Sequence, residues 1–83
     1  MSTIEHRPEE RRFVLSLDDG LGYLAYQLDD NDITFTSTFV PDNWRGRGLA
    51  RELVDAGLAW ARDQGYRIHA SCSYVQVVLK RGG

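Results

Sequence analysis

Apolar residues in the first half of the chain form short runs separated by turn residues, a pattern typical of strands. Phe13 to Leu17 is one such run, and Tyr23 to Leu28 alternates aromatic or aliphatic residues with small ones. Asp18-Asp19-Gly20, between them, has the composition of a hairpin turn. After a second turn at 29–32, Ile33 to Val40 is rich in β-branched and aromatic residues and is the clearest strand in the chain. The first half therefore predicts a hairpin-rich, mostly antiparallel sheet.

Helical spacing replaces this pattern after Pro41. Apolar or small residues recur every three or four positions at Leu49, Leu53, Ala56, Gly57, Trp60 and Ala61. Charged residues lie mainly on the opposite face, and Gly65 occupies the place where a glycine commonly ends a helix. We therefore expect an amphipathic helix whose apolar face, Trp60 included, packs in the core.

The last segment predicts one more strand and one more helix. Arg67 to Ser71 fits a short fourth strand, and Ser71 or Ser73 can cap the helix that follows. The side chains that share a face of that helix are Tyr74, Val77 and Val78. The pattern as a whole predicts an α+β fold with a mixed, mostly antiparallel sheet and two helices.

Length and composition fit one small domain. The chain has 83 residues, of which 42% are hydrophobic and 27% are charged, as in ordinary globular proteins. Residues 1–12 are polar and charged, so we expect a flexible lead-in there and a single domain over 13–83. No apolar run approaches the ~20 residues that cross a bilayer, and the N-terminus lacks the apolar stretch of a secretory signal. These features predict a cytoplasmic protein without a membrane partner.

Charge and cysteine content narrow the chemistry. The net charge of −2 gives no footprint for general nucleic-acid binding. Cys72 is the single cysteine, and His6 and His69 lie far apart in sequence, so we expect no metal site. The basic residues are arginines except for Lys80. Arginine suits bidentate contacts with phosphate, although genome composition explains the bias equally well.

The segment Arg45-Gly46-Arg47-Gly48-Leu49-Ala50 joins the clearest strand to the amphipathic helix. Its two glycines let the backbone approach a ligand closely, and the first helical turn offers free N–H groups and a partial positive charge to an anion. Arg45 and Arg47 can add charge-assisted bonds to phosphate. A Walker-type loop or a dinucleotide fingerprint fits worse, because the Gly-Lys-Ser/Thr ending and the three spaced glycines are missing. The alternative is a plain strand-to-helix connection with solvated arginines.

This segment resembles motif A of the GNAT acetyltransferase superfamily, Gln/Arg-x-x-Gly-x-Gly/Ala, through Arg45, Gly48 and Ala50. The chain is similar in particular to a family of very small GNAT-like proteins. Their Val-Pro-x-x-x-Arg-Gly-x-Gly-x-Ala pattern is matched from Val40-Pro41 to Ala50, and their Cys-x-Tyr-Val/Ile segment by Cys72-Ser73-Tyr74-Val75. The resemblance implies a truncated GNAT-like fold spanning nearly the whole chain.

The resemblance further implies that acetyl-CoA, or another acyl-CoA, is the co-substrate and that no metal is needed. The coenzyme A pyrophosphate would lie on the glycine turn and the pantetheine beside the strand that precedes it. The residues that would bind coenzyme A are Phe39, Val40, Arg45, Gly46, Arg47, Gly48, Leu49 and Ala50. An amine would attack the thioester near Cys72 and Tyr74.

Cys72 and Tyr74 are the candidate catalytic residues. Cys72, at the start of a helix, can form a thiolate that accepts the acyl group, or it can simply fill core space. Tyr74 can protonate the departing coenzyme A thiolate, or its ring can pack on the sheet. His69 is more typical of a structural histidine than of a base, and Trp44 more typical of packing than of adenine contact.

One departure from the family leaves two functions open. Small members carry His-Thr-Glu before the Val-Pro step, whereas this chain has Ser37-Thr38-Phe39, so a base at that glutamate is missing. The first function is an acetyl-CoA-dependent N-acyltransferase whose acceptor is an amine, with a protein amine as one candidate because the chain is short. The alternative is a non-catalytic module that binds or senses acyl-CoA.

Overall fold

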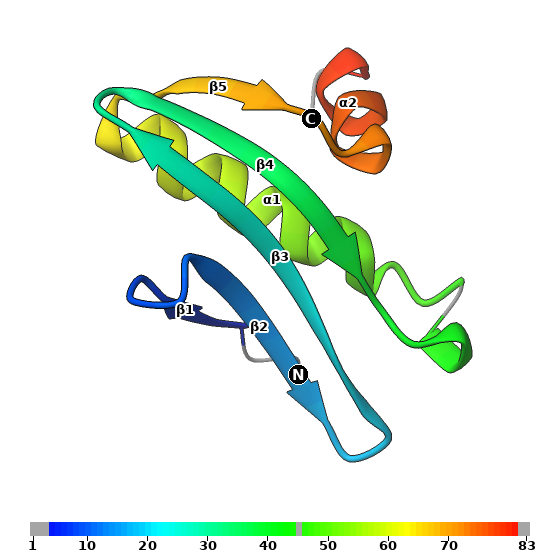
Figure 1. Cartoon of the computed structure of the whole chain (residues 1–83). Helices are drawn as coiled ribbons and strands as arrows, with labels where there is room; N and C mark the ends of the chain where they lie inside the picture. Colours follow the sequence, from blue (N-terminus) through cyan, green and yellow to red (C-terminus); the bar gives the residue numbers. More distant parts are fainter. Residues whose placement is uncertain (1–3, 45, 82–83) are drawn as a thin grey trace.

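The computed structural model describes residues 4–44 and 46–81. Figure 1 shows how the elements follow one another along the chain. In order, they are β1 (Ile4–Arg7), β2 (Arg12–Leu17), β3 (Gly20–Asp29), β4 (Asp32–Phe39), a 3₁₀ turn η1 (Asp42–Trp44), α1 (Leu49–Gln64), β5 (Arg67–Ala70) and α2 (Ser73–Lys80).

The strands form one sheet in the order β1-β2-β3-β4-β5. Neighbouring strands are antiparallel from β1 to β4, whereas β4 and β5 are parallel and are joined by α1. A parallel pair needs such a crossover because the chain must return to the same end of the sheet. The predicted mixed, mostly antiparallel sheet with two helices is confirmed.

The predicted lead-in contributes a strand, β1, which pairs with β2 at the edge of the sheet. His6 anchors it: its ring stacks on Phe13 with centroids 4.2 Å apart and contacts Trp60 edge-on at 4.5 Å. Its Nε2 lies 2.6 Å from the hydroxyl of Tyr26. These contacts are made to residues far along the sequence, so the short charged segment itself carries little sign of them.

The core lies between one face of the sheet and α1 (Figure 1). Leu24 and Phe35 from the sheet are fully buried against Leu53 and Leu58 from the helix. The helix approaches closely at Gly57, where an added Cβ would lie 2.5 Å from Leu24 Cδ2. The predicted apolar face of this helix is confirmed at Leu49, Leu53, Gly57 and Ala61. Ala56 and Trp60 are only partly buried, and Trp60 packs beside β1 against His6.

Of the three residues predicted to share a face of α2, only Val78 is buried. Val75 and Val78 enter the core, whereas Tyr74 and Val77 are 39% and 47% exposed. The N-cap is Cys72, not Ser71 or Ser73, so the prediction of a serine cap is wrong. Within the described residues, no helix is both long and apolar enough to span a membrane.

Candidate functional site

A β-bulge in β4 decides which side chains face the helices. Tyr26 pairs with Phe35 and the preceding Ala25 pairs with Ser37, which leaves Thr36 as an extra residue. Because residues alternate between the two faces of a strand, the extra residue reverses the alternation beyond it. The next pair shows the effect: Thr38 lies opposite the buried Leu24 and takes the core side.

Strands β4 and β5 separate just beyond the bulge. Their pairing runs from Asp32 and Arg67 to Phe35 and Ala70. The N–H groups of Ser71 and Cys72 then both donate to the Phe35 carbonyl, at 3.0 and 3.2 Å, and the chain turns into α2. In the described part of the chain, β4 therefore continues to Phe39 without a paired strand on this side.

An open cleft of about 520 Å³ lies where the strands separate. This volume is in the usual range for small-molecule sites. The end of β4, the turn that follows it and the first turns of α1 and α2 supply its lining: Thr38, Val40, Trp44, Gly46, Gly48, Leu49, Ala50, Arg51 and Tyr74. The cleft thus joins the glycine turn to Tyr74, one of the two predicted catalytic residues; the other, Cys72, is not among its lining residues.

Gly46 and Gly48 give the turn its shape. Their φ angles are 79° and 74°, in the left-handed region that favours glycine. Gly48 is the N-cap of α1 and makes no side-chain cap bond. The first N–H groups of the helix have no intrahelical acceptor and lie at the positive end of its dipole. An added Cβ on either glycine would meet no protein atom within 4 Å, so the space beside the turn is open.

The arginines around this turn play different parts. Arg45 lies outside the described residues. Arg47 does not line the cleft; its Nη1 donates to Asp19 Oδ2 over 2.8 Å. Arg51 does line the cleft, and its Nε also donates to Asp55 Oδ1 over 3.0 Å. Arg51 was missed as a binding residue, although its position three residues after Gly48, in the first helical turn, was a signal for it.

Thr38 links the cleft to Cys72. Its Oγ1 lies 3.5 Å from Cys72 Sγ, and Cys72 is half-buried at the start of α2. Burial raises the pKa of the Cys72 thiol, but hydrogen bonds from the N–H of Val75, the Thr38 hydroxyl and the N–H of Tyr74 outweigh burial and leave the pKa below its ordinary value. The cysteine is therefore more acidic than a free thiol and one contact away from the cleft.

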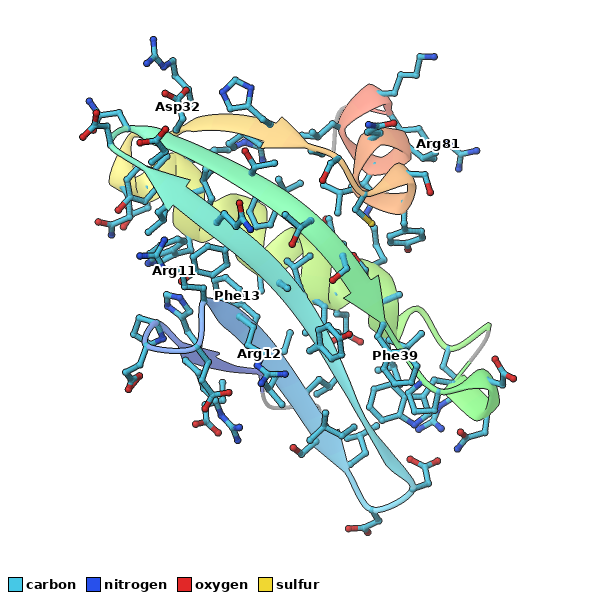
Figure 2. The ribbon with its side chains drawn as sticks, viewed as in Figure 1. Arg11, Arg12, Phe13, Asp32, Phe39 and Arg81 are labelled. Carbon is cyan, nitrogen blue, oxygen red and sulfur yellow. The ribbon has the colours of Figure 1, made fainter. Side chains whose placement is uncertain are left out.

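Phe39 lies on the other face of the sheet. It pairs with Tyr23, its ring centroid is 5.7 Å from that of Tyr23, and it is 49% exposed. Figure 2 shows it at the end of β4. The bulge at Thr36 accounts for this orientation, so Val40, and not the Phe39 side chain, lines the cleft.

Comparison with known proteins identifies the family. A family model described as GCN5-related N-acetyl-transferase matches residues 12–82. The chain belongs to the GCN5-related N-acetyltransferase family. The resemblance seen in the motifs around the glycine turn and Cys72 is thereby confirmed, and membership supports an acetyltransferase role.

Individual proteins also match along most of the chain. Protein NATD1 of Bos taurus is 31% identical, over 93% of this chain and 71% of that protein. Protein NATD1 of Gallus gallus is 30% identical, over 93% of this chain and 73% of that protein. The NMR solution structure of a GCN5-like protein from Staphylococcus aureus has a TM-score of 0.77 and 29% identity, covering 96% of this chain and 79% of that one. Sequence similarity and structural similarity therefore both show that this chain has a GCN5-like fold.

Proposed function

We propose that this protein binds acetyl-CoA in the cleft and transfers the acetyl group to an amine. The observation that carries the proposal is the continuity of the cleft, which runs from the anion-binding turn at Gly46 and Gly48 to Tyr74. Coenzyme A has matching chemistry, with a pyrophosphate at one end of a long arm and a thioester at the other. Membership in an acetyltransferase family supports the same conclusion.

The pyrophosphate would lie at the first turn of α1. Backbone N–H groups there are available to an anion, and the open space beside both glycines leaves room for phosphate oxygens. Arg51 lines this part of the cleft and supplies a positive charge. The pyrophosphate would share this guanidinium with Asp55, which accepts a hydrogen bond from its Nε.

The pantetheine arm would lie along the end of β4. Beyond Phe35 this strand has no neighbour in the described part of the chain on the side of β5, so its backbone groups can bond the two amides of the arm. Thr38 and Val40 line the same stretch. In this arrangement the thioester would lie between Thr38 and Tyr74.

In the reaction, the amine nitrogen attacks the thioester carbonyl, a C–N bond forms and the C–S bond breaks. The Tyr74 hydroxyl would donate its proton to the departing thiolate. The nitrogen must lose a proton, yet no described residue lining the cleft is a carboxylate or a histidine. We propose that water accepts this proton from an amine that arrives uncharged, and that a proton returns from the solvent to the Tyr74 phenolate. Binding without turnover is the second candidate function, and the same lack of a base favours it.

Two matched glycine variants test the coenzyme A site. Gly48 and Gly65 cap opposite ends of α1 with φ angles of 74° and 78°, and both face open space. A glutamate carries the same backbone strain at either position, but only at Gly48 does it place a carboxylate in the cleft. We expect Gly48→Glu to weaken coenzyme A binding by at least about tenfold in calorimetry, roughly 1.4 kcal/mol, and Gly65→Glu to bind like the wild type. Equal affinities for all three proteins would refute the proposed site.

Turnover separates the two candidate functions. Acetyl-CoA labelled in the acetyl group is incubated with the protein and a panel of small amines, peptides with a free N-terminus and peptides with lysine. Transfer of label to any amine supports the transferase. Tight binding with no transfer, and no label on Cys72 by mass spectrometry, supports the binding module.

A further inference from the structure

The β2–β3 hairpin turn packs against the segment that leads from β4 to the glycine turn. An added Cβ on Gly20 would lie 2.8 Å from Pro41 Cγ, and one on Gly22 would lie 2.9 Å from Trp44 Cζ3. Asn43 Nδ2 also donates to the backbone carbonyl of Asp19 over 3.3 Å. The hairpin turn therefore supports the segment that leads through Trp44 to Gly48, which we name the coenzyme A loop after its proposed ligand.

The Asp19 carboxylate contacts both ends of that loop. Its Oδ2 accepts a hydrogen bond from Arg47 Nη1 over 2.8 Å, and its Oδ1 accepts one from Trp44 Nε1 over 3.0 Å. These bonds, from Arg47 first and Trp44 second, hold the pKa of Asp19 below its ordinary value. The Trp44 side chain is buried, and the Arg47 N–H donates to the Trp44 carbonyl over 3.2 Å, which closes the loop on itself.

The ion pair directs Arg47 away from the ligand. Asp19 belongs to the hairpin turn, and Arg47 is not among the residues that line the cleft, although its neighbours Gly46 and Gly48 are. Arg51 is also paired with a carboxylate, that of Asp55, but it lines the cleft, whereas Arg47 does not. Arg47 is therefore placed to hold the loop and not to bond a phosphate.

We propose that Asp19 is a positioning residue for the coenzyme A site, which fixes the turn from Gly46 to Gly48 through Arg47 and Trp44. The inference rests on the proposed function, because it concerns the same loop. An exposed ion pair adds little to the stability of a fold. Here it restrains two left-handed glycines, which are the most flexible residues in a chain. Restraint before binding reduces the entropy that the ligand must overcome.

A double-mutant cycle distinguishes positioning from phosphate contact. Asp19→Asn keeps an acceptor for the Trp44 N–H but loses the charge that holds Arg47. We expect Asp19→Asn and Arg47→Gln each to weaken coenzyme A binding about three- to fivefold. The affinity of the double variant should equal that of whichever single variant binds less tightly. If Arg47 bonded a phosphate and Asp19 competed for it, Asp19→Asn would bind more tightly. Three outcomes would overturn the proposal: tighter binding by Asp19→Asn, losses that add in the double variant, and unchanged affinity in both single variants.

The control is Arg67→Gln. Arg67 also forms an exposed ion pair with an aspartate, Asp32, with its Nε and Nη2 each 3.0 Å from a carboxylate oxygen. Asp32 begins β4, whereas the coenzyme A loop follows its end, and Figure 2 shows Asp32 and Phe39 at the two ends of this strand. We expect this variant to bind coenzyme A like the wild type. A loss equal to that of Asp19→Asn would attribute the effect to stability alone and would count against positioning.

A measurement without ligand keeps this inference separate from the proposed function. In nitrogen-15 relaxation, the amide order parameters of Gly46 and Gly48 should fall in Asp19→Asn and Arg47→Gln, while those of β2 and β3 stay as in the wild type. Unchanged order parameters at both glycines would overturn the positioning role. If the wild type binds no coenzyme A, the proposed function fails, and the relaxation data still decide whether Asp19 orders the loop.

Discussion

Tyr74 lies in the first turn of α2, with its ring on the cleft and 39% of its surface exposed. Its neighbours Val75 and Val78 hold the helix in the core, so the tyrosine is free to meet a ligand. Among the cleft residues of the described chain it is the one with a phenolic proton. This placement makes it the residue at which the acid step is best tested.

We expect Tyr74→Phe to lower the rate of acetyl transfer by about 10²-fold or more, the usual contribution of a general acid, and to change coenzyme A affinity by less than about twofold. The phenyl ring keeps the wall of the cleft, and only the proton donor is lost. Transfer rates are measured by release of free thiol. Tyr23→Phe, on the other face of the sheet, serves as the control and should keep the wild-type rate. An undiminished rate in Tyr74→Phe would remove Tyr74 from the mechanism.

The approach of α1 to the sheet depends on Gly57. An added Cβ there would lie 2.5 Å from Leu24 Cδ2 and 3.1 Å from Phe35 Cε1, both on fully buried side chains. A larger residue would push the helix outward. Because the same helix begins at the glycine turn, its distance from the sheet also sets the width of the cleft.

For Gly57→Val we expect the free energy of unfolding to fall by about 2–3 kcal/mol, the cost of overpacking a close-fitting core. Urea denaturation measures it. Ala59→Val makes a similar change on the exposed side of α1, where only helix propensity is affected, and should cost about 0.5 kcal/mol. Similar losses in both variants would show that the close contact at Gly57 is unimportant.

Local patterns were enough to predict β2, β3, β4 and α1. Each has its own repeat of apolar positions, and Gly65 ends α1 in the left-handed conformation expected of a C-terminal glycine. Strand β1 was not predicted as an element, because its evidence lies in partners such as Phe13 and Trp60. The prediction for α2 was wrong at Tyr74 and Val77, which are exposed. Which face of a two-turn helix is buried depends on where the preceding strand ends, and the sequence pattern alone does not give that position.

In the candidate site, the glycine turn could be predicted and its surroundings could not. The motif from Arg45 to Ala50 is continuous in sequence, so an anion site there could be proposed from the sequence alone. The bond between Asp19 and Arg47 joins residues 28 positions apart. The bulge at Thr36 depends on how β4 pairs with β3, and it moved Phe39 away from the cleft while bringing Thr38 into it. Pairing geometry of this kind leaves no mark in a single sequence.

At the scale of the whole molecule, β1 closes the sheet on the edge away from the cleft, and a titrating residue secures it. Burial lowers the pKa of His6 below its ordinary value of 6.5, and the nearby charge of Glu9 opposes that shift only in part. The folded protein therefore favours the neutral ring. The unfolded chain binds more protons as the pH falls below about 6.5, so the stabilising effect of His6 is present above that value and is lost as the pH falls through the folded pKa.

We expect the free energy of unfolding of the wild type to fall between pH 7.5 and pH 5.5 and that of His6→Gln to change less over the same interval. Glutamine keeps a polar contact for the Tyr26 hydroxyl but does not titrate. Asp19 and Asp32, whose pKa values are lowered from 3.8 by their hydrogen bonds, lose their stabilising effect only at lower pH and do not disturb this window. Parallel pH curves for the two proteins would show that His6 is not the titrating group.

The extra residue in β4 has a consequence for how relatives are compared. Beyond Phe35, side chains at odd and even positions lie on the opposite faces of the sheet from those that they would occupy without the extra residue. Two chains aligned without a gap would therefore place different side chains in the cleft if their bulges differed by one position. Which side chains reach this cleft depends on the position of the bulge as well as on the residues that the strand contains. A residue-by-residue comparison of such clefts therefore holds only between proteins whose bulges lie at the same position.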